Sequence, residues 1–259
     1  MRIDNVSKDR KTGRVSITFK NTTPAMINTL RRAAIDLVPT MAIQEVTFNQ
    51  NTSAMYDEVI AHRLGLLVLK TDLKGYNLPA ECTCKGEGCA KCEVLLTLKA
   101  SGPGTVYASD IKCKDPKIKP EYPKTPIVKL LKGQNLEFIA AAGLGRGKTH
   151  VKHTPCLAWH TFNTKVTVNN NHKEFETYKE KYPKEIFTKD GKIDAKLIEK
   201  YNLYDACDRV NENIVKIEYD PETITLHIEP WGQLTAQKIL MRATEEVSNI
   251  FQEFEDKLK

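Results

Sequence analysis

The chain has 259 residues, of which 41% are hydrophobic and 28% charged, and this is the composition of an ordinary globular protein. Its net charge of +6 is too small to identify a nucleic-acid binder by itself. No stretch approaches the roughly 18 uninterrupted apolar residues of a membrane helix, and residues 1–15 lack the apolar segment of a signal peptide. We therefore expect a cytoplasmic protein without membrane contact.

The first elements predicted along the chain are a β-hairpin, a helix and a strand. Two alternating segments surround a turn at residues 11–13. A helix is predicted from Pro24, because Thr22 or Thr23 can cap it and a proline at the first helical position loses no hydrogen bond. Apolar residues then lie along one helical face until Pro39, and the segment MAIQEVTF alternates like a strand. Such a helix could simply cover the core of its own domain.

Four of the seven cysteines lie together in the segment ECTCKGEGCAKCE. Gly86 and Gly88 allow a tight loop that aims four thiolates at one point, as tetrahedral zinc requires. Iron–sulfur clusters also take thiolate ligands, but their usual spacing is CxxCxxC, so zinc is favoured over iron and over free thiols. Four cysteines leave no open coordination position, which indicates a structural site. The predicted ligands are Cys82, Cys84, Cys89 and Cys92.

Residues 112–132 are rich in lysine and proline. Spaced prolines exclude a helix, so we expect an extended or turn-rich path with its lysines on the surface. Because only Tyr122 could stack on a base, a solvated surface is favoured over a nucleic-acid site, with protein contact as the second interpretation.

The segment AGLGRGKT, residues 142–149, comes close to a phosphate-binding loop, with Ala142 in place of the first glycine. It supports the main alternative function, a nucleotide-hydrolysing enzyme. A phosphate loop needs a helix directly after Lys148, whereas the chain continues HVKHTPCLAWHTF without a helical apolar stripe. This alternative is therefore disfavoured.

Histidines and a cysteine after this loop have spacings that could suit a metal. A second zinc is conceivable here, but alternate residues of an extended segment point to opposite faces, so convergence is not favoured. The residues concerned are His150, His153, Cys156 and His160.

The last part of the sequence is predicted to hold two strands and a long helix. The strands, at residues 215–219 and 223–228, are joined by a turn at Asp220-Pro221. After Trp231-Gly232, apolar residues step by three and four for more than six turns, from Leu234 to Leu258. A small sheet cannot cover such a stripe, so a partner helix is expected.

Several segments resemble the assembly subunits of RNA polymerase, namely the archaeal D subunit, the third-largest subunit of eukaryotic polymerase II and, more distantly, the bacterial alpha subunit. The segments are NTLRRAAIDLVPTMAI, DEVIAHRLGLLVL, the four-cysteine loop and GLGRGKTHVKHTPCLAW, in which His153 stands where relatives often have tryptophan. The resemblance spans nearly the whole chain.

The resemblance implies an α+β fold with a discontinuous dimerisation domain, residues 1–46 and 214–259. A mainly β insert domain, residues 47–164, would carry the cysteine loop at residues 82–92. Residues 165–213 resemble the outline of a ferredoxin-like insertion, but Cys207 alone cannot ligate an iron–sulfur cluster, so we expect a degenerate form without one.

The resemblance also implies a non-catalytic assembly platform for transcription. It would pair with subunit L, bind small zinc-containing subunits and receive the large catalytic subunits, without sequence-specific DNA contact and without catalytic residues of its own. The expected dimer surface comprises Met26, Ile27, Leu30, Ala34 and Leu37 of the first helix and Leu240, Ala243, Val247, Phe251 and Phe254 of the last.

Overall fold

A computed structural model describes residues 1–259 as two compact units. The smaller unit comprises Met1–Asn5, Thr18–Pro24 and His160–Thr225. The larger unit comprises Val6–Ile17, Ala25–Trp159 and Leu226–Lys259. No helix in either unit combines the length and apolar character needed to cross a membrane.

One four-stranded sheet has the strand order β1-β2-β10-β9. Its strands are β1 (Arg2–Lys8), β2 (Val15–Lys20), β9 (Cys156–Val168) and β10 (Val215–Pro230). The predicted hairpin is confirmed, because β1 and β2 flank a turn in which the Asp9 carbonyl accepts from Gly13 N–H at 3.0 Å.

The predicted turn at Asp220-Pro221 is wrong, since β10 runs through it without a break. Pro221 is exposed, and proline is tolerated where a strand position needs no ladder N–H. The Asp220 side chain accepts a hydrogen bond from Glu222 N–H, and the Glu222 carbonyl accepts one from Thr22 N–H. These bonds satisfy the backbone locally without reversing the chain.

Residues 165–213 of the smaller unit form short helices around a core of their own. The helices are α3 (Phe175–Tyr178), α4 (Ala195–Tyr201) and α5 (Tyr204–Cys207), with 3-10 turns η4 (Lys179–Lys181) and η5 (Lys184–Ile186). Ile186, Ile193, Ile198 and Cys207 are buried together. Beyond the end of β9 at Val168, only an isolated bridge between Phe187 and Ile193 adds strand pairing, so the ferredoxin-like fold stays a prediction.

The larger unit is built on two antiparallel sheets, β3-β8-β4-β6 and β5-β7. Their strands are β3 (Thr40–Asn51), β4 (Glu93–Ser101), β5 (Gly104–Tyr107), β6 (Lys112–Cys113), β7 (Pro126–Leu130) and β8 (Asn135–Gly145). The accompanying helical segments are α2 (Asp57–Gly65) and the 3-10 turns η1 (Pro79–Glu81), η2 (Ala108–Asp110) and η3 (Val151–His153). Together with the helices, these sheets make the fold α+β, as predicted.

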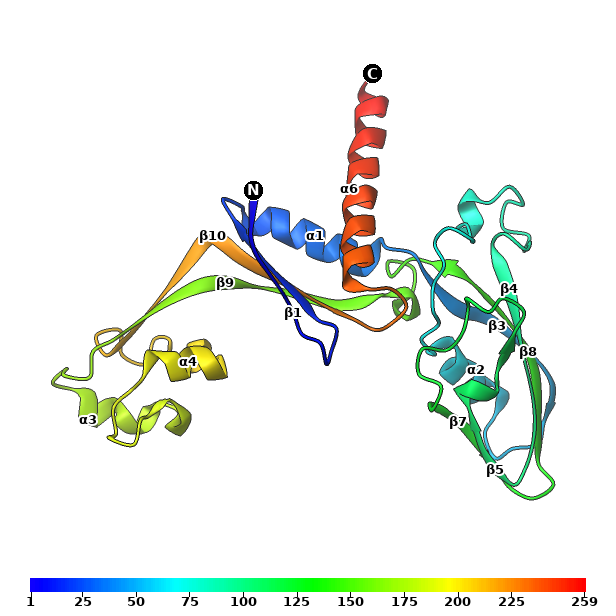
Figure 1. Ribbon diagram of the computed structural model, residues 1–259, viewed down its shortest axis with the longest axis horizontal. Helices are drawn as coiled ribbons and strands as arrows, with labels where there is room; N and C mark the ends of the chain where they lie inside the picture. The colour runs from blue at the N-terminus through cyan, green and yellow to red at the C-terminus, as the bar shows by residue number, and fades with distance from the viewer. The chain divides into compact units, whose positions relative to one another are not determined.

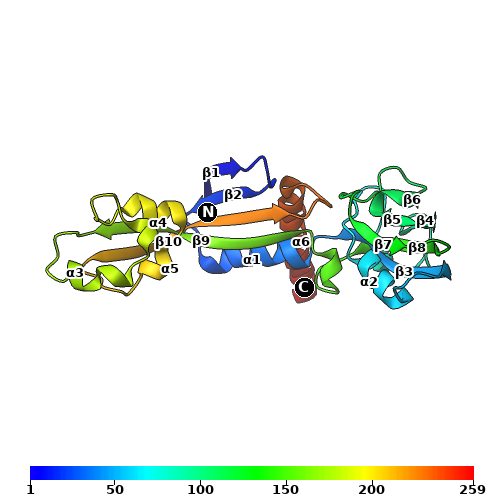
Figure 2. The same ribbon diagram turned by 90° about the horizontal axis from the view of Figure 1, so that it is seen from below.

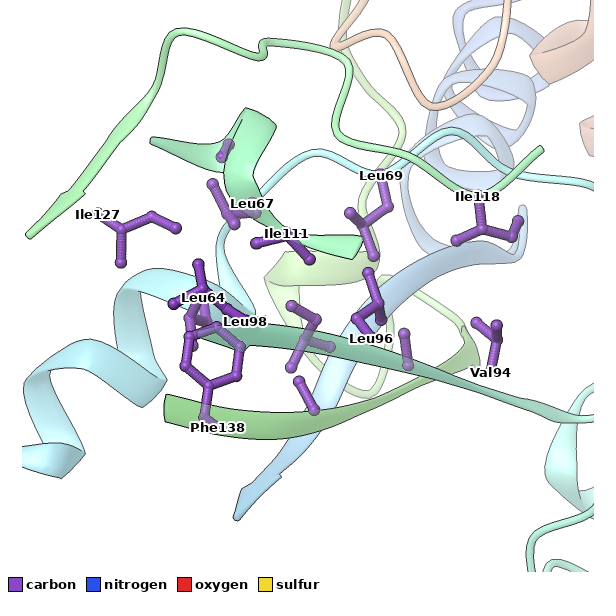
Figure 3. Packing of buried hydrophobic residues seen from close by; sticks show 14 of the residues in the cluster. Leu64, Leu67, Leu69, Val94, Leu96, Leu98, Ile111, Ile118, Ile127 and Phe138 are labelled. Carbon is purple, nitrogen blue, oxygen red and sulfur yellow. The ribbon is translucent and has the colours of Figure 1, made fainter. Parts of the chain in front are cut away.

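The core of the larger unit follows from strand alternation. In β4, Leu96 and Leu98 are buried, whereas Leu95 is exposed on the opposite face. Phe138 of β8 and Leu64 of α2 pack into the same cluster (Figure 3). The sheet therefore has one buried and one open face, as antiparallel sheets commonly do.

Two long helices complete the larger unit. Helix α1 (Pro24–Asp36) begins at the predicted proline, and α6 (Ala236–Leu258) begins after Thr235, whose side chain accepts a hydrogen bond from Lys238 N–H. Helix α6 starts beside the end of α1 (Figures 1 and 2). Its buried residues all lie in its first half, and every residue from position 248 onwards is exposed.

Shortening Leu96 should destabilise the larger unit, because Leu96→Ala removes buried methyl groups and leaves a cavity. We expect a loss of about 2–5 kcal/mol in the free energy of unfolding, measured by urea titration. The matched control is Leu95→Ala on the open face, for which a change within about 0.5 kcal/mol is expected. Equal losses for the two variants would contradict the assignment of the buried face.

Candidate metal centre and the loop beside it

The four predicted cysteines meet between η1 and β4. All four sulfur atoms lie within 4.8 Å of one another, and none of the cysteines is in a disulfide. The Cys82–Cys89 and Cys84–Cys92 sulfur pairs are 3.5 and 3.4 Å apart. Zinc–sulfur bonds of about 2.3 Å in a tetrahedron place neighbouring sulfurs about 3.8 Å apart. The donor set and its spacing therefore fit a single tetrahedral metal ion.

The loop that carries these thiols is shaped by glycines and backbone hydrogen bonds. Gly86 and Gly88 have φ of +89° and +84°, a conformation that side chains disfavour, which confirms why glycines are needed there. Cys92 N–H donates to the Cys89 carbonyl and so turns the second pair of ligands inward. A hydrogen bond with Cys92 lowers the pKa of the Cys84 thiol to about 6, whereas burial and hydrogen bonds with the other thiols raise the pKa of the Cys92 thiol to about 12.

The histidines after the phosphate-like loop have other partners. His153 is buried, and its Nδ1 donates to the Thr40 carbonyl at 2.8 Å. Burial lowers the pKa of His153, so its ring is held neutral. Cys156 lies against the Ala34 carbonyl, and burial raises the pKa of this thiol to about 12. His153 and Cys156 each lie against a backbone carbonyl, and neither belongs to a group of metal ligands.

The phosphate-like loop closes the end of helix α1. After β8 ends at Gly145 the chain turns and enters the 3-10 turn η3, so no helix follows Lys148. The Lys148 N–H donates to the Asp36 carbonyl at 3.0 Å. A Cβ on Gly147 would lie 2.2 Å from the Ile35 carbonyl oxygen. The glycine permits close approach to α1, and the N–H that a phosphate would need satisfies a helix-terminal carbonyl instead.

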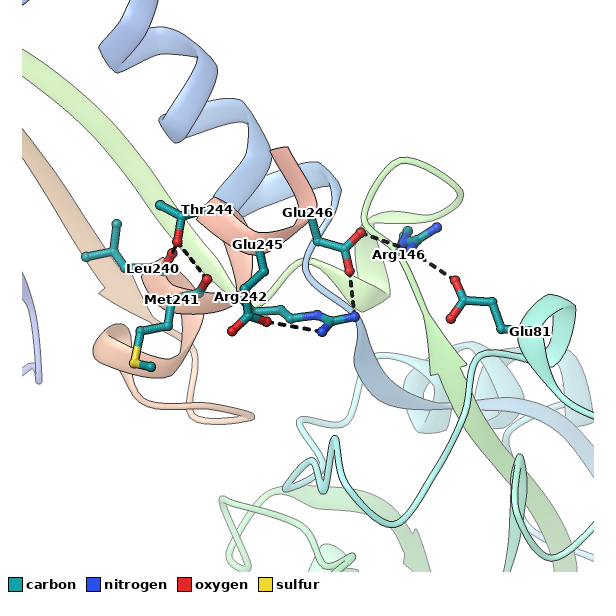
Figure 4. A network of polar contacts seen from close by, with 8 residues as sticks. All are labelled: Glu81, Arg146, Leu240, Met241, Arg242, Thr244, Glu245 and Glu246. Carbon is teal, nitrogen blue, oxygen red and sulfur yellow. Dashed lines mark hydrogen bonds and ion pairs between the residues drawn. The ribbon is translucent and has the colours of Figure 1, made fainter. Parts of the chain in front are cut away.

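A network of charged side chains lies next to this loop (Figure 4) and was not predicted from the sequence. The Glu246 carboxylate of α6 is 6% exposed and lies 3.0 Å from Arg146 Nη2 and 2.8 Å from Arg242 Nη2. The contact with Arg242 is an ion pair without aligned hydrogen-bond geometry. Arg146 Nη2 also lies 3.3 Å from Glu81, the residue before Cys82. The sequence signal was an acidic residue inside the apolar stripe of the helix.

The predicted dimer-surface residues divide into three groups. The ones that the chain buries in its own interior are Ile27, Leu30, Ala34 and Ala243. Leu37, Leu240 and Val247 are half-buried. Met26, Phe251 and Phe254 are 50%, 66% and 61% exposed.

Helix α1 thus mainly covers its own core, which was the simpler interpretation of its periodicity. The large apolar side chains that α6 exposes also include Met241, Ile250 and Leu258, which the prediction omitted. Four of the exposed apolar side chains, Ile250, Phe251, Phe254 and Leu258, lie in the second half of α6.

Comparisons with known proteins connect this architecture to transcription. Residues 43–158 match the family described as the RNA polymerase Rpb3/RpoA insert domain. Among curated relatives named DNA-directed RNA polymerase subunit Rpo3, the Methanosarcina acetivorans protein is 38% identical over 230 residues, 87% of this chain and 86% of its own length. The Pyrococcus horikoshii protein is 35% identical over 230 residues, again 87% and 86%. The Archaeoglobus fulgidus protein is 37% identical over 184 residues, 71% and 70%.

Adding a methyl group at Gly147 should displace the loop from α1. Gly147→Ala is expected to lower the thermal midpoint by several degrees, as a clash with a backbone carbonyl costs on the order of 1–3 kcal/mol. Lys148→Ala keeps the backbone N–H and should leave the midpoint unchanged.

Calorimetry with ATP distinguishes a phosphate-binding loop from a loop that closes the end of helix α1. We expect no saturable binding to the wild-type chain or to Lys148→Ala. Micromolar binding that Lys148→Ala abolishes would contradict the helix-closing role and restore the phosphate loop.

Proposed function

Because the chain belongs to the family of the archaeal RNA polymerase D subunit (Rpo3), we propose that it pairs with subunit L and forms the platform on which the large catalytic subunits dock. It is a non-catalytic assembly subunit of DNA-dependent RNA polymerase, a nucleotidyltransferase complex. The alternative of a nucleotide-hydrolysing enzyme is not supported, since the phosphate-like loop serves helix α1.

The observation that carries this proposal is the uncovered apolar face of α6. Ile250, Phe251, Phe254 and Leu258 are each at least half exposed over the last turns of the helix. Fully burying one such side chain is worth about 1.5–3 kcal/mol, and contiguous apolar patches on soluble proteins usually mark interfaces. A helix of subunit L laid along this face would supply the missing cover, and Met26 of α1 would extend the contact.

The division of labour within the chain is part of the same proposal. Residues 1–46 and 214–259 would form the dimerisation domain, and residues 47–164 the insert domain that meets the small zinc-containing subunits. The match of residues 43–158 to the insert-domain family supports this boundary. Residues 165–213 would be a ferredoxin-like insertion that has lost its cluster. The chain would lie in the cytoplasm with the polymerase. It would make no sequence-specific contact with DNA.

We assign a structural zinc to the four-cysteine site. Cys82, Cys84, Cys89 and Cys92 would hold the ion with a closed shell, so the ion would contribute folding energy to the loop and no chemistry. The sulfur spacing and the absence of a disulfide support this choice.

Placing a charge on the proposed interface should abolish pairing. Phe251→Asp would bury an unpaired carboxylate at the centre of the apolar contact, at a cost of several kcal/mol. Wild-type chain co-expressed with subunit L should elute from size exclusion as a heterodimer, and the variant should not. Asn249→Asp adds the same charge beside the stripe and should pair normally. A Phe251→Asp chain that still pairs, or a wild-type chain that ignores subunit L, would refute the interface.

Removing one ligand should empty the metal site. Purified wild-type chain is expected to contain about one zinc and no iron, and Cys89→Ser should lose the zinc and unfold at lower temperature. Cys113→Ser is the control, because Cys113 lies outside the four-cysteine group. Elemental analysis showing iron and sulfide in the wild type, or unchanged zinc in Cys89→Ser, would contradict the assignment.

A further inference from the structure

The loop at residues 145–154, which we call the junction loop, touches three parts of the larger unit. Its Lys148 N–H and Gly147 meet the end of α1. Its Arg146 reaches α6 through Glu246 and the four-cysteine loop through Glu81 (Figure 4). The Arg146 side chain thus connects the four-cysteine site with α6, the helix of the proposed interface.

Glu246 holds α6 in one orientation. A carboxylate this deeply buried is tolerated only when opposite charges compensate it, and here Arg242 approaches from the same helix and Arg146 from the junction loop. Rotating α6 would separate Glu246 from Arg146 and leave the acid with one partner. The direction in which Phe251 and Phe254 project therefore depends on where Arg146 lies.

Arg146 is in turn positioned by the cysteine loop. The same Nη2 atom lies 3.0 Å from Glu246 and 3.3 Å from Glu81. Glu81 ends η1 and is bonded directly to Cys82, whose N–H donates to the Pro79 carbonyl. A metal ion that fixes the Cys82 sulfur also restricts the backbone from which Glu81 extends.

We propose that metal binding at the four cysteines and pairing through α6 are energetically coupled through Glu81, Arg146 and Glu246. The inference rests on the proposed function, since it takes α6 as the pairing surface. A bound metal ion restricts the positions that the Glu81 side chain can reach, and Glu81 in turn fixes the position of Arg146. Arg146 then holds α6, through Glu246, in the orientation that pairs. A chain without its metal would be a poorer partner, so that assembly selects metal-loaded subunits.

Coupling between two binding sites is reciprocal, which makes the proposal quantitative. If zinc tightens pairing by some factor, pairing must tighten zinc binding by the same factor. The Glu81 side chain is 57% exposed, and solvent weakens its contact with Arg146. Exposed ion pairs are weak, so the factor should be modest, about threefold to fivefold.

The test uses the full chain and subunit L. One arm measures the pairing affinity of zinc-loaded and chelator-stripped chain by fluorescence anisotropy of labelled subunit L. The other arm measures zinc affinity with a chromophoric chelator, for the chain alone and for the heterodimer, and needs no stripped protein. In the wild type both arms should give the same factor, about threefold to fivefold.

Two substitutions in the cysteine loop locate the path. Glu81→Gln removes the charge that contacts Arg146. The factor by which zinc tightens pairing and the factor by which pairing tightens zinc binding should then both be close to one. Glu87→Gln is the matched control, an exposed glutamate of the same loop with no ion pair, and should keep the wild-type factor. Arg146→Lys keeps a charge without the shared guanidinium and should behave like Glu81→Gln.

Each outcome decides a different point. Wild-type chain that pairs equally well with and without zinc, or Glu81→Gln and Glu87→Gln with equal factors, would overturn the coupling and leave the proposed function standing. Zinc-loaded wild type that does not pair with subunit L at all would overturn the proposed function and the coupling together.

Discussion

A buried carboxylate between two guanidinium groups is the interaction on which the arrangement of the larger unit depends. Glu246 lies on α6, Arg242 one turn before it and Arg146 on the loop after β8. Losing one partner of a buried charge typically costs about 3–5 kcal/mol, whereas an apolar residue in the same place would tolerate several orientations. The charge therefore favours the orientation of α6 that keeps both arginines beside Glu246, and this orientation matters when the free face of the helix must meet another chain.

The same loop shows how one sequence pattern can serve two kinds of structure. A phosphate loop and the junction loop both need glycine for close approach and backbone N–H groups that point at an acceptor. Here the acceptor is the Asp36 carbonyl at the end of α1, and Gly147 passes against Ile35. The choice of acceptor depends on the next segment of the chain, where Pro155 and the short turn η3 exclude the helix that a phosphate site needs.

Short-range patterns could be predicted from the sequence because their physical causes are local. The four-cysteine loop, the helix start at Pro24 and the hairpin around residues 11–13 depend on residues within a few positions of one another. The interruption predicted at Pro221 was wrong because proline forbids a ladder N–H and does not by itself reverse a chain. Periodicity identified the apolar faces of α1 and α6, but it cannot say whether this chain or another one covers them. The contact of Arg146 with Glu246 joins residues 100 positions apart, so the acidic position in the stripe of α6 is visible in the sequence but its partner is not.

Hydrogen exchange tests most directly whether the second half of α6 is a surface built for another subunit. Amides of residues 248–258 should exchange quickly in the isolated chain, because no packing holds this part of the helix. In the assembled polymerase they should become strongly protected, while those of Leu96 and Leu98 in β4 stay protected in both states. Equal exchange of residues 248–258 in the isolated chain and in the polymerase would contradict the account.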